Sequence, residues 1–272
     1  MRVITKISDL PDYLGMKVGF VPTMGALHEG HLSLMRAAKA NNSLTVASIF
    51  VNPLQFLPNE DYGRYPRPIE RDLELCEAVG VDIVFNPTAD ELVGDGLTTV
   101  AVEGVTELYE GLARPGHFEG VATIVAKLFM LLRPNVAYFG LKDLQQCLVI
   151  RQMVKDLHFP VELAFSPTLR EDDGLALSSR NRYLSETHRR AAPKLYEILR
   201  HISGQVQANE NSDAALTEGK QYLAANGFVV DYLDWVSVPD MRSIREIGES
   251  SESALIAAAY LGKTRLIDNI LL

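Results

Sequence analysis

The sequence is poor in cysteine, and it lacks a long hydrophobic run. Cys76 and Cys147 are the only cysteines among its 272 residues, and two distant thiols build neither a disulfide framework nor a zinc cluster. The apolar segment 121–132 is interrupted by Thr123 and Lys127 and is too short to cross a bilayer, and the first residues carry no basic-then-apolar signal pattern. We therefore expect a cytoplasmic protein with no membrane partner.

Positive charge is also in short supply. Lysine and arginine number 26 against 35 aspartates and glutamates, which leaves a formal net charge of −9. This acidic balance argues against a nucleic-acid surface as the main partner, although it is compatible with a local basic pocket. The length fits one large or two modest domains, and a hydrophobic content of 47% is ordinary for a globular chain.

Short apolar runs and amphipathic segments alternate through the first 168 residues. The segment 44–50 is almost continuously apolar, as expected of a parallel strand covered on both faces. Similar patterns predict strands at 1–4, 17–22, 82–86, 136–139 and 161–166, and helices at 30–41, 69–79, 121–132 and 144–157. The alternation predicts an α/β fold, a Rossmann-like, doubly wound parallel sheet.

The pattern changes after Pro167. Helices are predicted at 185–207 and 212–226 and strands at 229–238, 253–260 and 264–270, so the two kinds of element no longer alternate one for one. We expect residues 1–168 to form the Rossmann-like domain and residues 169–272 a smaller C-terminal α+β domain that covers the site. Two polar stretches, 57–68 and 111–120, are predicted to be surface loops, and a lid over a cleft is the functional interpretation of the first.

The stretch 18–31 is the most informative part of the chain. An apolar strand leads into a turn that contains Gly25, and His28, Gly30 and His31 then open an amphipathic helix. A helix N-terminus offers unpaired N–H groups and a partial positive charge, and residues three apart share a face, so both imidazoles can point at one phosphate. A capping histidine and a metal site are the alternatives. No third metal ligand lies at a matching spacing nearby, and the strand-then-helix context favours a nucleotide site of the HxGH type.

Further polar residues follow the other predicted strands. In open α/β sheets, ligands bind beyond the carboxyl ends of the strands. We therefore expect His31, Gln55, Lys142 and Ser179 to line one cleft between the two domains. Asn52 and Gln55 on their own are more typical of a turn.

Charged residues in these stretches point to phosphate, each with a simpler alternative. Lys142 at a helix start opposes the helix dipole, and a bound anion would resolve that conflict, whereas Asp143 is well explained as a helix cap. Ser178 beside Arg180 forms either a compact phosphate cradle or a simple turn. Asp72 is a candidate magnesium ligand together with phosphate oxygens, although an exposed first-turn carboxylate is its more ordinary role.

Seven segments, in order and spread over nearly the whole chain, resemble the pantoate–β-alanine ligase (pantothenate synthetase) family. They are PTMGALHEGH (22–31), SIFVNPLQF (48–56), YPR (65–67), RPGHF (114–118), FGLKDLQQ (139–146), DGLALSSRN (173–181) and RLIDN (265–269). The HxGH part is shared with cytidylyltransferases and class I aminoacyl-tRNA synthetases. The chain departs from the family pattern at Leu141, where glutamate is usual, and at Leu54, where methionine is usual.

The resemblance implies an AMP-forming carbon–nitrogen ligase of pantothenate biosynthesis. The family condenses pantoate with ATP to pantoyl adenylate and pyrophosphate, and β-alanine then displaces AMP to give pantothenate. The resemblance also implies dependence on Mg²⁺ and a homodimeric state. It assigns His31 as a proton donor beside the catalytic groups His28, Lys142 and Arg180, and it assigns Gln55 and Gln146 to pantoate, with Gln55 also binding β-alanine. The implied ATP site comprises Met24, Gly25, Ala26, Leu27, His28, Glu29, Gly30, His31, Gly140, Leu141, Lys142, Asp143, Leu169, Leu177, Ser178, Ser179 and Arg180.

Two other functions remain open at this point. A nucleotidylyltransferase would leave AMP or CMP on its product, and release of free AMP separates it from a ligase. A non-catalytic nucleotide sensor would retain the fold without the chemistry. The intact set of His28, His31, Lys142 and Arg180 weighs against the sensor.

Overall fold

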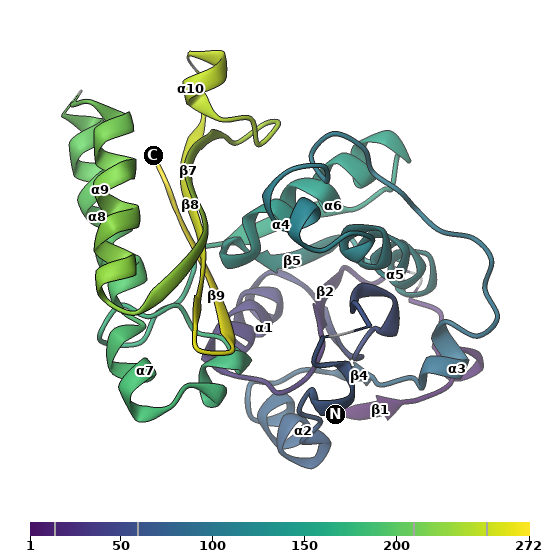
Figure 1. Cartoon of the computed structure of the whole chain (residues 1–272). Helices are drawn as coiled ribbons and strands as arrows, with labels where there is room; N and C mark the ends of the chain where they lie inside the picture. Colours follow the sequence, from purple (N-terminus) through teal and green to yellow (C-terminus); the bar gives the residue numbers. More distant parts are fainter. Residues whose placement is uncertain (14, 59, 209, 249) are drawn as a thin grey trace. The chain divides into compact units, whose positions relative to one another are not determined.

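The computed structural model describes residues 1–13, 15–58, 60–208, 210–248 and 250–272, and the chain divides into two compact units (Figure 1). Unit 1 comprises Met1–Leu141 and Gln145–Pro167, and unit 2 comprises Lys142–Leu144 and Thr168–Leu272. Within the described part of the chain, no helix combines the length and the apolar character needed to cross a membrane.

Unit 1 is built on a six-stranded parallel sheet with the strand order β1-β4-β3-β2-β5-β6. Its strands are β1 (Arg2–Ile4), β2 (Val18–Thr23), β3 (Leu44–Ile49), β4 (Ile83–Phe85), β5 (Val136–Gly140) and β6 (Glu162–Ser166). Its helices are α1 (Glu29–Asn41), α2 (Ile69–Ala78), α3 (Ala89–Leu92), α4 (Tyr109–Ala113), α5 (His117–Leu132) and α6 (Leu144–Asp156), the first residue of which belongs to unit 2. The predicted doubly wound α/β fold is confirmed.

Helices cover both faces of this sheet, because alternate residues of each strand point to opposite sides. On one face, Met35 of α1 and Cys76 of α2 pack into a core with Val21 of β2. On the other face, the ring of Phe129 in α5 meets Phe20 of β2 edge-on, with 6.4 Å between the ring centroids. Burial on both sides explains why the strand sequences are continuous apolar runs.

The strand order reverses between β2 and β5, which are hydrogen-bonded neighbours. Such a reversal opens a crevice beyond the carboxyl ends of the two strands, where α/β proteins bind their ligands. β2 ends at Thr23, and the segment with His28 and His31 follows it. The fold of unit 1 therefore places this segment at the expected ligand-binding edge.

Unit 2 contains a three-stranded antiparallel sheet in the order β7-β8-β9. Its strands are β7 (Phe228–Ser237), β8 (Ser253–Leu261) and β9 (Thr264–Leu271), and its helices are α7 (Glu186–Ala191), α8 (Lys194–Gln207), α9 (Ser212–Ala225) and α10 (Ile244–Ile247). Leu199 and Ile202 of α8, Leu223 of α9 and Leu255 of β8 share one buried core. Apolar side chains spaced three and four apart along α8 form the stripe that faces this core.

Two element predictions were wrong in detail. The single helix expected over 185–207 is divided into α7 and α8 at Pro193, because proline lacks the N–H that would continue the helical hydrogen bonds. The loop expected over 111–120 contains the end of α4 and the first turn of α5. Gly116 precedes α5 with a φ of 81°, a left-handed conformation in which glycine is not strained.

Candidate active site

The turn between β2 and α1 is held by a buried carboxylate. Asp72 of α2 is 1% exposed, and its two oxygens accept hydrogen bonds from the backbone N–H groups of Ala26 and Leu27, both at 2.8 Å. Gly25 has a φ of +77°, and a Cβ there would lie 2.9 Å from the Asp72 carboxylate. The expectation that Asp72 is an exposed first-turn residue was wrong, since α2 turns this side chain inward onto the turn.

His28 and His31 cap the start of α1 in a reciprocal way. The Nδ1 atom of His28 accepts from Gly30 N at 3.2 Å, and the Nδ1 atom of His31 accepts from His28 N at 3.4 Å. A backbone N–H only donates, so each neutral ring carries its proton on Nε2. The two ring centroids lie 4.1 Å apart. The capping interpretation is therefore correct for Nδ1. In the tautomer that it selects, each ring has its N–H donor, the kind of group that binds an anion, at Nε2.

The remaining residues of the predicted ATP motif in unit 1 belong to two segments of the chain. Met24 to Leu27 form the turn, and Glu29 is paired with Arg36 at 2.5 Å on the exposed side of α1. Gly140 ends β5, and Leu141 begins a short 3-10 helix, η4 (Leu141–Asp143).

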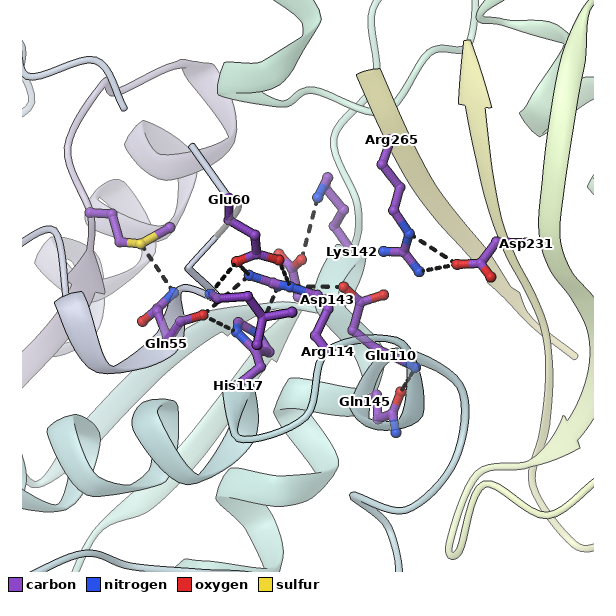
Figure 2. A network of polar contacts seen from close by, with 12 residues as sticks. Gln55, Glu60, Glu110, Arg114, His117, Lys142, Asp143, Gln145, Asp231 and Arg265 are labelled. Carbon is purple, nitrogen blue, oxygen red and sulfur yellow. Dashed lines mark hydrogen bonds and ion pairs between the residues drawn. The ribbon is translucent and has the colours of Figure 1, made fainter. Parts of the chain in front are cut away.

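Gln55 lies at the end of the 3-10 helix η2 (Pro53–Gln55), which follows β3. Asn52, 1% exposed, caps this helix and donates to Gln55 Oε1 and to Gly120 O, each at 3.0 Å. Gln55 Nε2 lies 3.1 Å from the sulfur of Met24 (Figure 2). A Cβ at position 120 would lie 2.3 Å from Leu54 O, so only glycine allows α5 to approach η2 this closely. The structure thus brings Gln55 and Met24, two predicted site residues, into contact.

Gln145 and Gln146 are neighbours in α6 with different surroundings. Gln145 is buried, and its amide donates to Val105 O and Leu108 O and accepts from Glu110 N at 2.7 to 3.0 Å. Gln146 is partly exposed. The amide of Gln145 is committed to holding the preceding segment, which leaves Gln146 as the glutamine suited to a ligand.

A cluster of charged residues lies beside Gln55, and we call Glu60, Glu110, Arg114 and His117 the Arg114 cluster (Figure 2). Arg114 Nε and Nη2 donate to the two oxygens of Glu60 at 2.6 and 2.7 Å, and Arg114 Nη1 lies 3.4 Å from Glu110 Oε1. Burial acts to raise the pKa of Glu60, but the Arg114 guanidinium outweighs it and the pKa lies below its ordinary value. Glu60 lies in the predicted lid 57–68, which is therefore tied to the chain just before α5.

His117, at the start of α5, is 6% exposed. Burial lowers the pKa of His117 to about 4, with a further contribution from the positive charge of Arg114. The imidazole is therefore neutral at physiological pH.

In unit 2, Lys142 is fixed through its backbone. Its carbonyl oxygen accepts from Asn269 Nδ2 of β9 at 3.0 Å, and its ammonium lies 3.4 Å from the Asp143 carboxylate. The Lys142 side chain is 21% exposed. The charge that opposes the dipole of α6 is thus partly balanced by its neighbour.

The second predicted ATP segment of unit 2 forms a small hairpin. Leu177 N donates to Leu169 O at 3.0 Å, which places these two predicted residues opposite each other. Ser178 then begins the 3-10 helix η5 (Ser179–Tyr183), its hydroxyl accepting from Arg180 N at 3.3 Å.

Arg170 anchors this hairpin to β9. Its guanidinium makes two hydrogen bonds to the Asp268 carboxylate at 2.6 and 2.8 Å, and it lies over the Tyr196 ring at 3.4 Å from the centroid. It also donates to Gly174 O and Asn269 O. We call Arg170, Tyr196, Asp268 and Asn269 the Arg170 cluster.

The two clusters were missed as functional groups by the sequence interpretation, although some of their residues lie within quoted motifs. RPGHF contains Arg114 and His117, and RLIDN contains Asp268 and Asn269. The signal in the sequence that could have indicated these clusters was a charged or polar residue at a helix start or within an apolar strand. The partners, Glu60 and Arg170, are 54 and 98 residues away, and spacing alone does not reveal such pairs.

A doubly wound parallel sheet with donor groups beyond β2 is typical of α/β enzymes that bind nucleotides. Comparison with known proteins identifies the family. A family model described as pantoate–β-alanine ligase matches residues 2–271. The chain is 48% identical to a pantothenate synthetase of Moorella thermoacetica over 280 residues, covering 100% of this chain and 99% of that protein.

Two solved structures extend the similarity to the fold. Pantothenate synthetase of Thermus thermophilus matches with a TM-score of 0.93 at 47% identity, covering 99% of both chains. Pantoate–β-alanine ligase of Francisella tularensis, solved with "beta-gamma ATP" and β-alanine, matches with a TM-score of 0.83 at 36% identity, covering 100% of this chain and 97% of that one. The chain belongs to the pantoate–β-alanine ligase family, and it is an enzyme that ligates pantoate to β-alanine.

Proposed function

We propose that the ligation proceeds through a pantoyl adenylate made from ATP. A carboxylate oxygen of pantoate attacks the α-phosphorus, a new P–O bond forms, and pyrophosphate leaves with the electrons of the broken bond. The amine of β-alanine then attacks the activated carbonyl carbon, the C–N bond forms, and AMP leaves while the nitrogen loses a proton. Hydroxide is a poor leaving group and AMP a good one, which is the chemical reason for the first step.

The observation that carries this proposal is the shared tautomer of His28 and His31. Both rings accept at Nδ1 and hold their proton on Nε2, next to the N-terminus of α1. Donors fixed in advance stabilise the negative charge that grows on the phosphates as the α-phosphorus is attacked. In this role His31 donates its Nε2 proton in a hydrogen bond to the departing pyrophosphate.

The other groups complete the two binding functions. ATP is contacted by the side chains of Lys142 and Arg180. It is also contacted by the backbone of Met24 to Gly30, Gly140 to Asp143, Leu169 and Leu177 to Ser179. Gln55 and Gln146 bind pantoate, and Gln55 also binds β-alanine. In this assignment residues 1–168 are the ATP- and pantoate-binding domain, and residues 169–272 are the smaller domain that covers the site. That His31, Gln55, Lys142 and Ser179 share one cleft stays a prediction.

Magnesium is part of the proposal as the counterion of ATP. Mg²⁺ is usually held by substrate phosphates and water with one or two carboxylates. Asp72 does not fit this role, because it is 1% exposed and both of its oxygens accept backbone N–H groups of the turn. We therefore propose that the ion enters with the nucleotide and that Asp72 shapes the nucleotide turn.

The loop 57–68 has a use in this chemistry, since water would hydrolyse the adenylate. The bond from Arg114 to Glu60 gives the loop a fixed point about which it can close. We further propose a homodimer located in the cytoplasm, where the thiols of Cys76 and Cys147, which are buried and form no disulfide, remain reduced.

The test is product analysis. With pantoate, β-alanine, ATP and Mg²⁺, the enzyme is expected to form AMP, pyrophosphate and pantothenate in equal amounts. With β-alanine omitted, it is expected to release one pyrophosphate per site and to retain the adenylate. Formation of ADP and phosphate, or a product that keeps the AMP group, would contradict the proposal.

A further inference from the structure

In the proposed function, the turn between α4 and α5 serves only to anchor the loop 57–68 through Arg114. Arg114 directly follows α4 and His117 begins α5, and both side chains reach the same backbone atom in η2. His117 Nδ1 lies 2.8 Å from Gln55 O, and Arg114 Nη2 donates to the same oxygen at 3.2 Å (Figure 2). Two donors on one carbonyl, that of a predicted substrate-binding residue, need an explanation.

The hydrogen bonds determine the protonation of the imidazole. Arg114 Nη1 lies 3.1 Å from His117 Nε2. A guanidinium has only donors, so Nε2 must accept and the neutral ring must carry its proton on Nδ1. That proton is then donated to Gln55 O. The contact with Arg114 thus selects the tautomer that can hold Gln55.

The carbonyl of Gln55 is a group that its own helix leaves without a partner. The last carbonyl groups of a helix have no N–H to accept from within the helix. The same residue is held on its side-chain end by Asn52, which donates to Oε1. With the carbonyl and Oε1 both fixed, the direction of the Gln55 amide Nε2–H groups is determined by its surroundings.

We infer that His117 is a positioning residue for pantoate: its Nδ1–H holds the Gln55 carbonyl and so directs the Gln55 amide toward the substrate. Arg114 acts one step further away, by selecting the His117 tautomer. The inference rests on the proposed binding of pantoate by Gln55. His117 itself is not placed against the reacting atoms.

The electrostatic surroundings agree with a permanently neutral ring. Burial and the cation of Arg114 lower the pKa of His117 to about 4, while the Gln55 carbonyl, Glu110 and Glu60 act in the opposite direction. A protonated ring would donate from Nε2 and would face the Arg114 guanidinium with like charge. The geometry therefore operates with the Nδ1–H tautomer across the physiological pH range.

Two substitutions separate the two nitrogens of the ring. The amide nitrogen of asparagine falls near Nδ1 of histidine, and that of glutamine falls near Nε2. His117→Asn therefore keeps a donor for Gln55 O, whereas His117→Gln removes it and keeps a polar group at Arg114. We expect His117→Gln to raise KM for pantoate roughly 3- to 10-fold, the effect of losing one hydrogen bond, with KM for ATP within about 2-fold. His117→Asn is expected to stay within about 2-fold of wild type for both substrates.

Control variants distinguish the inference from the proposed function. Gln55→Ala is expected to raise KM for pantoate, and an unchanged value would overturn the proposed role of Gln55. Suppose that Gln55→Ala raises KM for pantoate, but that His117→Asn and His117→Gln raise KM for pantoate and KM for ATP equally. The His117 side chain is then only structural, and the inference is wrong. His201→Gln, an exposed histidine of α8 in unit 2, should change neither KM.

The wild-type enzyme provides a measurement that does not depend on a variant folding. Imidazole ¹⁵N resonances of the full chain are expected to identify the Nδ1–H tautomer of His117 near pH 7. Pantoate is expected to shift the Nδ1 signal, and ATP alone should leave it in place. An Nε2–H tautomer, or a signal that pantoate does not move, would overturn the inference.

Discussion

Unit 1 and unit 2 each use a partly buried arginine to hold a segment that the family resemblance assigns to substrate, but the two clusters differ in chemistry. In unit 1, Arg114 acts on Gln55 partly through the neutral imidazole of His117. In unit 2, Arg170 binds Asp268 with two hydrogen bonds, stacks on Tyr196 and involves no imidazole. The Arg114 cluster of unit 1 therefore depends on a proton at one nitrogen of His117, whereas the Arg170 cluster of unit 2 depends on a pair of charges.

The largest effect is expected when the carboxylate of the Arg170 cluster in unit 2 is removed. The Asp268 side chain is 3% exposed, so Asp268→Ala leaves the partly buried charge of Arg170 without its carboxylate partner. We expect a loss of about 3–5 kcal/mol in the free energy of unfolding. Urea denaturation followed by the fluorescence of Trp235, the single tryptophan and part of β7, reports on unit 2 directly.

The matched control is an exposed ion pair in the same unit. Arg190 and Glu186 lie 3.9 Å apart with side chains 84% and 94% exposed, so Glu186→Ala should change stability by less than about 0.5 kcal/mol. Equal effects of the two substitutions would mean that the Arg170 cluster is not held by its buried charge pair.

In unit 1, His117 is expected to make the stability of the fold depend on pH. His117 has a pKa of about 4 in the folded chain and an ordinary value near 6.5, so between these values the unfolded chain binds a proton that the folded chain does not. Stability contributed by neutral His117 is complete above pH 6.5 and is lost as the pH falls toward 4. Between pH 7 and pH 4.5 the loss is about 2 kcal/mol.

His117→Asn should remove this part of the pH dependence, as measured by urea unfolding with far-ultraviolet circular dichroism at the two pH values. His201→Asn is the control and should keep the wild-type dependence. The assignment of the pH dependence to His117 fails if the wild type and His117→Asn lose the same free energy between the two pH values.

A smaller effect, on the KM for pantoate, is expected at Gln146, the neighbour of the buried Gln145. Gln146→Ala removes one proposed hydrogen bond to pantoate, so KM for pantoate should rise roughly 3- to 10-fold while KM for ATP changes little. Steady-state kinetics with each substrate varied in turn gives both values. Equal weakening for ATP and pantoate would remove Gln146 from the pantoate site.

The smallest expected effect is at Leu141, where the family usually has glutamate. Leu141 begins η4, directly before Lys142. If the glutamate of the family serves only local pairing, Leu141→Glu should change kcat and both KM values by less than about 2-fold. A change of 10-fold or more in kcat would show that this position contributes to the chemistry.

The parallel sheet was predictable because most of its strands are apolar runs and because amphipathic helices connect β2 to β3, β3 to β4 and β5 to β6. The strand predicted at 17–22 is shifted by one residue from β2, and the strand predicted at 44–50 extends one residue beyond β3. The division of α7 from α8 at Pro193 follows a rule that applies to the sequence alone. The short helix α4 was not predicted, since five residues within a glycine-containing stretch carry no helical period.

The chemistry of the site was less accessible to sequence. The spacing of His28 and His31 predicted a shared face, but only the structure gives the Nδ1 contacts that define their tautomers. Asp72 carries the same local signal as any first-turn carboxylate, and its inward direction depends on packing against the turn at Gly25. The contacts of His117 depend on a tertiary approach of α5 to η2 that no local pattern encodes.

The central claim is that His28 and His31 act on the triphosphate during adenylate formation, and His31→Ala tests it most directly. We expect pyrophosphate release from pantoate and ATP, without β-alanine, to slow by about 100-fold or more, because a fixed donor to developing charge is lost. ATP binding should weaken much less, and the reaction of isolated pantoyl adenylate with β-alanine should be little affected. A variant that forms adenylate at the wild-type rate but stalls at the amide step would contradict the account.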